Sequence, residues 1–279
     1  MSNTSKNNSY YAFTEHTDAF SVLQEVFVNF SIHYFLIGAQ ARDVHFYQKG
    51  IKPTRGTRDI DFAVMVQDMR HYNELKEQLV NKGFVQTKDP FRLNWNEGQT
   101  VIDLLPFGEI EEDYTVNFDQ RNVELSVLGY SELNDEIEQL SIDNNISVPV
   151  PPIHGIFLLK LLSWDDTKPD REKDLTDLQQ ILSNYWAFSE DEAYEKHLDL
   201  FDDDNFTTEL ASARILGRHL KQIIQKSEIL NKKIVQILHE QISQTDPPGL
   251  MVQQFANTQQ KTIEEIRLLL DTILKGITD

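Results

Sequence analysis

Cysteine is absent from this chain. Its absence excludes disulfide bonds, thiolate metal sites and cysteine nucleophiles, and it favours a cytoplasmic protein. The sequence also lacks an apolar run approaching the roughly 18 residues that a membrane span requires. The first ten residues lack the apolar core of a signal peptide, and neither a P-loop nor a Gly-x-Ser-x-Gly pattern occurs. We therefore expect a cytoplasmic protein that has no membrane partner.

The composition is that of a globular protein. Of its 279 residues, 40% are hydrophobic and 25% are charged, and 26 basic against 45 acidic side chains give a net charge of −19. This acidity argues against a general nucleic-acid coat protein. The basic residues nevertheless gather in two islands, at residues 42–58 and 214–233. Each island is either a phosphate-binding surface or an ordinary solvated face.

Hydrophobic periodicity predicts an α+β protein with two domains after a flexible tail at residues 1–10. Residues 11–150 are expected to form a mixed sheet flanked by helices, and residues 151–279 an α-helical domain that begins after Pro151-Pro152. Expected strands cover residues 33–37, a strand with Asp59 and Asp61, 84–87, 92–96, 100–105 and 123–127. Expected helices cover residues 17–30, 39–47, 68–82 with Asp68 as N-cap, 131–140, 153–164, 171–185, 190–197, 207–225, 227–241 and 248–274.

Three carboxylates lie within apolar strand patterns. Asp59 and Asp61 alternate with Ile60 and Phe62, so they point to one face of their strand. Asp103 lies in a second apolar run, Val101-Ile-Asp-Leu-Leu. If the two strands are neighbours, the cluster is repulsive without a cation, and ligands that are oxygens alone favour Mg²⁺ or Mn²⁺.

Longer motifs resemble a known family. Phe35-Leu-Ile-Gly-Ala-Gln-Ala-Arg-Asp43, Arg55-Gly-Thr-Arg-Asp-Ile-Asp-Phe62, Ile102-Asp-Leu-Leu-Pro-Phe-Gly108 and Lys160-Leu-Leu-Ser-Trp164, followed by the segment 171–178, are similar to the AbiEii/AbiGii-type nucleotidyltransferases. These belong to the superfamily built like DNA polymerase β and are often the toxins of toxin–antitoxin or phage-defence pairs. The resemblance covers roughly residues 30–185.

The resemblance implies roles for residues that match its motifs. The metal ligands would be Asp59, Asp61 and Asp103, and these three together with Lys160 would be catalytic. Gly38 would let the backbone approach a triphosphate at a helix N-terminus. The nucleotide-binding residues would be Gly38, Ala39, Arg42, Arg58, Lys160, Lys173 and Asp174, with Asp174 orienting Lys173 or contacting the sugar. Each of these residues also has an ordinary structural reading, Lys173 and Asp174 as a helix salt bridge for example.

The sequence leaves two questions open, the activity of the protein and the acceptor of the nucleotide. The leading hypothesis is metal-dependent transfer of a nucleoside monophosphate from an NTP to an acceptor hydroxyl, an RNA or tRNA 3′ end being favoured over a protein hydroxyl. The alternative is a catalytically weak nucleotide-binding or partner-binding member, because Ala39 and Thr167 depart from the residues common in relatives. An antitoxin protein is a candidate partner. The histidines, including His154 and His219, lack a metal-ligand spacing and are expected to be structural or solvated.

Overall fold

The structure is a computed structural model that describes residues 17–54, 57, 59–118, 122–142, 146–167, 172–202 and 206–279. The expected tail at residues 1–10 and Arg58 lie outside these ranges. The chain divides into two compact units. The sheet unit comprises Met1–Gln40, Pro53–Val127 and Gln139–Val150, and the helical unit comprises Ala41–Lys52, Leu128–Glu138 and Pro151–Asp279. Residues 41–52 and 128–138, which fall within the range expected for the sheet domain, group with the helices, and the last segment of the helical unit begins at Pro151.

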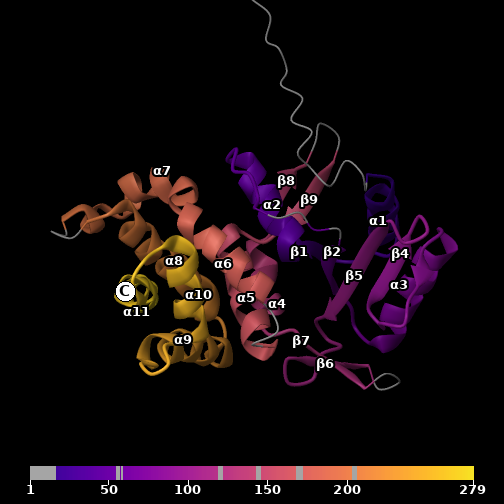
Figure 1. Ribbon diagram of the computed structural model, residues 1–279. Coiled ribbons are helices and arrows are strands. Elements are labelled where there is room, and N and C mark those ends of the chain that lie inside the picture. The colour runs from indigo at the N-terminus through magenta and orange to yellow at the C-terminus, as the bar shows by residue number, and fades with distance from the viewer. Residues whose placement is uncertain are drawn as a thin grey trace, which may run out of the picture. The chain divides into compact units, whose positions relative to one another are not determined.

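The sheet unit is built on a mixed five-stranded sheet, as the sequence predicted. Its strands run in the order β1-β2-β5-β4-β3, and only the central pair, β2 and β5, is parallel. The strand bounds are β1 Tyr34–Ile37, β2 Asp59–Met65, β3 Val85–Gln86, β4 Arg92–Trp95 and β5 Thr100–Phe107. The parallel pair requires a crossover, and α3, Met69–Asn81, lies within it. This crossover puts the two strands that carry the carboxylates next to each other at the centre of the sheet (Figure 1).

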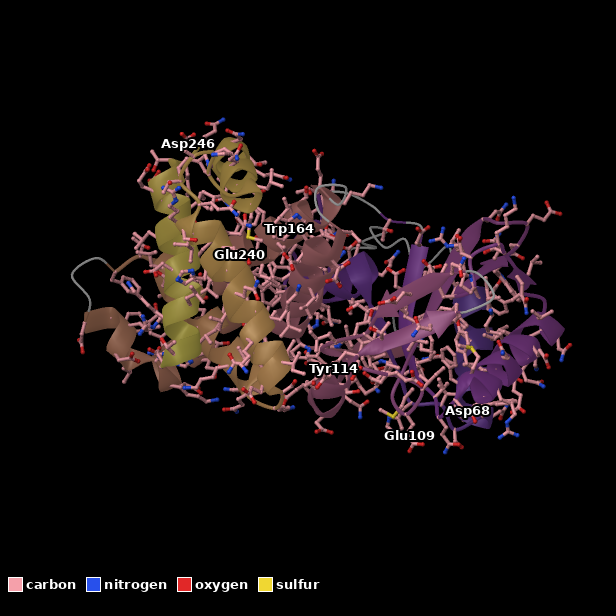
Figure 2. All side chains as sticks on the ribbon, turned by 90° about the horizontal axis from the view of Figure 1, so that it is seen from below. Asp68, Glu109, Tyr114, Trp164, Glu240 and Asp246 are labelled. Carbon is pink, nitrogen blue, oxygen red and sulfur yellow. The ribbon has the colours of Figure 1, made fainter. Side chains whose placement is uncertain are left out.

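Helices α1, Thr17–Asn29, and α3 contact each other in the sheet unit (Figure 1). The ring of Phe62 lies 5.6 Å from that of Phe20 and 5.7 Å from that of Phe27, so α1 packs against the apolar side of β2. Asp68, labelled in Figure 2, caps α3 by accepting a 2.7 Å hydrogen bond from the His71 amide, which confirms the predicted N-cap.

Short strands after β5 depart from the prediction. The expected helix at 131–140 is wrong: α4 covers only Tyr130–Leu133, a 3₁₀ turn η3 follows at Asn134–Glu136, and β8 begins at Glu138. The cause is tertiary, because β8, Glu138–Ser141, pairs with β9, Ser147–Val150, and this pairing outweighs helix propensity. The sequence also missed β6, Thr115–Phe118, which pairs antiparallel with the expected β7, Val123–Ser126.

The helical unit confirms most of the expected helices. Its elements after Pro152 are α5 Ile153–Thr167, α6 Glu172–Asn184, α7 Trp186–Lys196, the 3₁₀ turn η4 Leu198–Asp202, α8 Thr208–Ile224, α9 Glu228–Ser243, α10 Leu250–Gln259 and α11 Ile263–Thr278. The single helix expected at 248–274 is wrong, because Gln260 ends α10 in a left-handed conformation. Thr262 and Glu265 then form a capping box that starts α11.

The core of the helical unit is close-packed. Trp164 on α5, labelled in Figure 2, is fully buried. Helices α8 and α11 meet where Gly217 faces Gly276, and a Cβ added at Gly217 would overlap the Ile273 carbonyl oxygen, so this close approach requires glycine. In the described part of the chain, no helix combines the length and the apolarity that crossing a membrane would need.

We expect acid to destabilise the helical unit through two buried histidines. Burial lowers the pKa of His45 to about 4, although its bond to the Pro151 carbonyl opposes this, and burial followed by the charges of His219 and His45 lowers the pKa of His154 to about 3. The unfolded chain therefore binds more protons below pH ~6.5, and each histidine removes roughly 1.4 kcal/mol of stability per pH unit until its folded pKa is reached. Denaturant unfolding at pH 7, 6 and 5 measures this slope.

The matched variants are His154→Gln and His239→Gln, the second at an exposed position on α9. The pH slope should shrink by about one proton in His154→Gln and stay unchanged in His239→Gln. Equal slopes in both variants would contradict the assignment to His154.

Candidate active site

The three predicted carboxylates lie on one face of the sheet. Asp61 on β2 is the register partner of Asp103 on β5, and paired residues of neighbouring strands point to the same face. Asp59 is two residues before Asp61 and so shares that face. Ile60 and Phe62 point the other way and are fully buried. The structure therefore brings together the side chains on which the metal prediction depends.

Arg92 on β4 is part of this cluster, although no sequence motif indicated a role for it. It is the register partner of Asp103, and its Nε and one terminal nitrogen each donate a 2.7 Å hydrogen bond to an Asp103 carboxylate oxygen. The same guanidinium lies 3.8 Å from an Asp59 oxygen. Only the antiparallel β4–β5 register places Arg92 here, and the spacing of two separate runs does not fix that register.

The electrostatics of the cluster follow from this pairing. The hydrogen bonds to Asp103 raise the pKa of Arg92 further above its usual value, against the opposing effect of burial. Tyr72 on α3 donates a 2.8 Å hydrogen bond to the Leu104 carbonyl. The pKa of Tyr72 is raised mainly by burial and, to a smaller extent, by the negative charge of Asp103. Arg92 thus supplies one positive charge against three carboxyl groups. A set of carboxylate oxygens with negative charge left over fits a hard divalent cation.

Gly38 begins α2, Gly38–Gln48, and touches the carboxylate cluster. Its φ is +73°, and a Cβ added there would overlap the Asp61 carboxylate. Both facts require glycine. Ala39 is buried, and Gln40 donates a 3.1 Å hydrogen bond to the Thr57 carbonyl just before β2. The turn into α2 and the start of β2 are therefore fixed to each other, and the triphosphate role of Gly38 and Ala39 stays a prediction.

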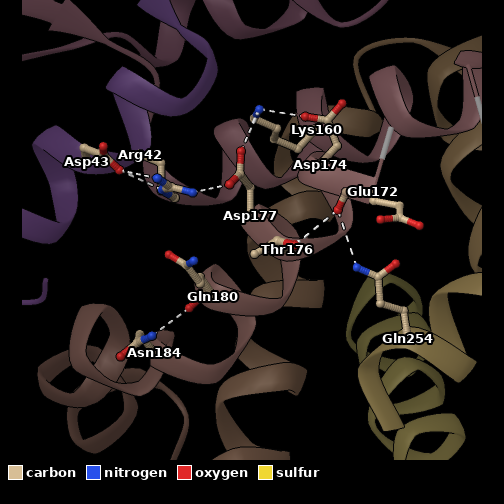
Figure 3. A network of polar contacts seen from close by, with 10 residues as sticks. All are labelled: Arg42, Asp43, Lys160, Glu172, Asp174, Thr176, Asp177, Gln180, Asn184 and Gln254. Carbon is tan, nitrogen blue, oxygen red and sulfur yellow. Dashed lines mark hydrogen bonds and ion pairs between the residues drawn. The ribbon is translucent and has the colours of Figure 1, made fainter. Parts of the chain in front are cut away.

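A buried network of charges lies inside the helical unit (Figure 3). Lys160 on α5 contacts Asp174 at 2.7 Å and Asp177 at 2.8 Å, both on α6. Burial alone lowers the pKa of Lys160, but the charges and hydrogen bonds of Asp177 and Asp174 outweigh burial and raise it. Lys160 is therefore a protonated side chain whose charge is already compensated. Asp174, which we expected to serve Lys173 or a sugar, accepts from Lys160 instead.

Arg42 completes the network. Its side chain is fully buried on α2, donates to Asp43 over 2.8 Å and pairs with Asp177, so one carboxylate joins Arg42 and Lys160 (Figure 3). Lys173 is exposed on α6. Contacts of Arg42, Lys160, Lys173 and Asp174 with a nucleotide stay predictions, and the same prediction for Arg58 falls outside the described residues.

Comparison with solved structures gives distant likenesses. One is an antigenic nucleotidyltransferase-like protein from Paracoccidioides brasiliensis, at 19% identity and a TM-score of 0.41, covering 61% of this chain and 76% of that one. Another is ANT(2″)-Ia in complex with adenylyl-2″-tobramycin, at 15% identity and a TM-score of 0.38, covering 74% of this chain and 99% of that one. A solution structure of ANT(2″)-Ia, an antibiotic-resistance factor, matches at 14% identity and a TM-score of 0.35, over 74% and 94% of the two chains. These likenesses are too distant to carry functional detail. No curated protein is significantly similar to the chain.

A family model gives the decisive result. The model described as "Nucleotidyl transferase AbiEii toxin, Type IV TA system" matches residues 46–261, which is most of the chain. The match includes Asp59, Asp61, Arg92 and Asp103, and it continues into the helical unit as far as residue 261, beyond the segment that carried the resemblance. The resemblance seen in the sequence is thereby confirmed: the chain belongs to the AbiEii nucleotidyl transferase family of toxins.

Proposed function

We propose that this nucleotidyl transferase moves a nucleoside monophosphate from an NTP to an acceptor hydroxyl with the help of a divalent cation. One observation carries the proposal: Asp59, Asp61 and Asp103 share one face of two paired strands beside a glycine turn. Nucleotidyl transfer requires an aligned hydroxyl and neutralisation of the departing pyrophosphate. Mg²⁺ or Mn²⁺ held by the three carboxylates would polarise the phosphate and lower the pKa of the hydroxyl.

The residues of the chain have distinct tasks in this proposal. Asp103 is the candidate to accept the proton of the incoming hydroxyl, and Arg92 holds its carboxylate in a fixed orientation. The Asp61 carboxylate lies close to Gly38, where an added Cβ would overlap it. The amide groups that open α2 offer donors to a phosphate, because the first turn of a helix has unpaired N–H groups and a positive dipole end.

Arg92 should compete with the cation for the carboxylates. In Arg92→Gln the bidentate pair with Asp103 is lost, so the charge it compensated becomes available, and we expect Mn²⁺ to bind roughly tenfold more tightly. Electron paramagnetic resonance of free Mn²⁺ measures this affinity without any turnover. Arg70→Gln, at a highly exposed position of α3, is the matched control and should leave the affinity unchanged. Unchanged or weaker binding in Arg92→Gln would contradict competition.

For the acceptor we keep an RNA 3′ end, such as that of tRNA, as the first candidate, because the basic island at 214–233 motivated it. In the structure five of its six cations are ion-paired, namely Arg214, Arg218, Lys226, Lys232 and Lys233. The pair of Lys232 with Glu228 is highly exposed, and such a pair contributes only about 0–1 kcal/mol, so a phosphate can replace the carboxylate there. Binding to tRNA should then weaken steeply with salt.

A protein hydroxyl is the second candidate, and the same ion pairs favour it. Most cations of the basic island at 214–233 are paired with carboxylates, and the chain has a net charge of −19. The island therefore offers little uncompensated positive charge to an extended polyanion such as RNA. The test supplies labelled NTP and Mg²⁺ with total tRNA in one arm and total protein in the other. Label in RNA supports the first acceptor, and label on protein supports the second.

The catalytically weak alternative rests on two residues. Ala39 is buried and offers no hydroxyl, and the Thr167 hydroxyl donates over 2.9 Å to the Ser163 carbonyl of its own helix. Calorimetry with NTP, run beside a pyrophosphate-release assay, separates the alternatives. Binding together with acceptor-dependent release supports transfer, whereas binding without release in either acceptor arm supports a nucleotide-binding protein. An antitoxin partner fits the type IV toxin–antitoxin family and is part of the proposal.

A further inference from the structure

A second cluster of side chains that could hold a metal ion lies in the helical unit, and none of its members belongs to the carboxylate cluster. Glu192 on α7, His197 at the end of α7 and His219 on α8 offer ligand atoms that lie within 4.8 Å of one another. Helices α7 and α8 contact each other (Figure 1). The sequence did not indicate this site, because only Glu192 and His197 are near each other along the chain.

The His197 ring carries the inference. Its Nε2 is buried and has no hydrogen-bond partner, and the Glu192 carboxylate lies 3.8 Å from it. Buried ring nitrogens normally have a hydrogen-bond partner, so a buried nitrogen without one needs an explanation. A binding site for an ion is one such explanation. The other oxygen of Glu192 is 2.9 Å from the Nε2 of His219. Ligands of a tetrahedral ion with bonds of about 2.0–2.1 Å lie about 3.3 Å apart, so small side-chain rotations suffice.

The protonation states suit a metal. The Tyr185 hydroxyl lies 2.6 Å from Nδ1 of His219, and Arg218 donates over 2.8 Å to Nδ1 of His197, so each proton sits on Nε2. When an ion binds Nε2 of a ring, the proton of that ring moves to Nδ1. In His219 this Nδ1–H can then donate a hydrogen bond to the Tyr185 hydroxyl oxygen.

The surroundings allow a dication. Arg218 must release His197, and it has other acceptors in Asp199 and Asp279. The Asp199 carboxylate, which also binds that guanidinium nitrogen at 3.0 Å, can then accept from Nδ1 of His197. Lys196 lies 3.3 Å from Glu192 but is mostly exposed and can turn into water. The remaining titratable neighbour, His154, is buried with its ring 4.9 Å from that of His219 and is neutral.

We infer that Glu192, His197 and His219 form a binding site for a borderline transition-metal ion of the Zn²⁺ class. Two imidazoles and one carboxylate suit Zn²⁺, Co²⁺ or Ni²⁺ better than Mg²⁺, and three protein ligands leave a fourth position for water or a small ligand. Because its ligands come from α7, the end of α7 and α8, the ion ties these elements together. This inference is independent of the proposed transfer reaction.

The test uses the full chain carrying Asp61→Asn, which weakens the carboxylate cluster as a competing site. After dialysis against chelator, Zn²⁺ is titrated by calorimetry, and Co²⁺ by its visible absorption, which is strong only in a tetrahedral setting. We expect one Zn²⁺ per chain and a melting temperature that rises with Zn²⁺ but not with Mg²⁺. Added to this background, His197→Gln and Glu192→Gln should each weaken Zn²⁺ binding by about tenfold or more.

His239→Gln, an exposed histidine of the same unit, is the matched control and should leave Zn²⁺ affinity unchanged. Circular dichroism of each variant verifies folding, and Glu192, which is 30% exposed, is the position least able to disturb it. Absence of stoichiometric Zn²⁺ binding, or equal losses in His239→Gln and His197→Gln, would overturn the inference. Either result leaves the transfer reaction untouched.

Discussion

Asp61→Asn should abolish nucleotidyl transfer while leaving the fold intact. Asparagine keeps the shape of the side chain that packs against Gly38, but it removes the charge that would bind the cation. Loss of a metal ligand removes several kcal/mol of transition-state stabilisation, so we expect the rate to fall roughly 1000-fold or more. The rate is measured as pyrophosphate release in the presence of whichever acceptor becomes labelled in the test described above. Titration of the same variant with Mn²⁺ should show that it binds the ion more weakly than the wild type.

The matched control for Asp61→Asn is Asp113→Asn. Asp113 is exposed in the loop before β6, and its positive φ of 48° suits asparagine. This control makes the same chemical change in the same unit, and its activity should equal that of the wild type. Incorporation that is equal in Asp61→Asn and the wild type would reject the carboxylate cluster as the active site, whatever the acceptor.

Arg42→Leu should destabilise the helical unit by about 3–5 kcal/mol. Arg42 is fully buried, and its removal takes away a cation that pairs with Asp177, which is also fully buried and which also pairs with Lys160. An uncompensated buried charge costs far more than the pair itself contributes. Chemical denaturation followed by circular dichroism gives the free energy of unfolding.

Two further variants sharpen the test of Arg42. Arg214→Leu breaks a surface ion pair with Asp279 in the same unit and should cost less than about 1 kcal/mol. The double variant Arg42→Leu/Asp177→Leu removes both partners, and Lys160 keeps Asp174, so it should be more stable than Arg42→Leu alone. A double variant that is less stable than Arg42→Leu would show that the network has a net stabilising role beyond charge compensation.

The carboxylate cluster could be predicted from sequence because strand alternation is a local property. The order Asp59, Ile60, Asp61, Phe62 determines which side chains share a face of the strand. Asp103 joins them if its strand lies next to theirs, which was the one further assumption. Local capping signals succeeded in the same way at Asp68. Periodicity also placed most helices after Pro152, since each buries one apolar face.

What the sequence did not indicate depends on contacts between distant segments. Arg92 joins the cluster through the register of two strands, and His219 meets Glu192 across two helices. The break between α10 and α11 did have a local signal, the Thr262-x-x-Glu265 pattern, which the continuous apolar periodicity around it obscured. At residues 138–141 strand pairing overrode a plausible helix.

The parallel pairing of β2 with β5 has a consequence for how the protein is made. Asp59 and Asp61 leave the ribosome well before Asp103, because α3, β3 and β4, which carries its partner Arg92, lie between them in the chain. A nascent polypeptide that ends before β5 contains Asp59 and Asp61 but lacks Asp103, the third carboxylate of the cluster. If this cluster is the active site, as proposed, the toxin becomes catalytically competent only after most of the sheet unit has been synthesised.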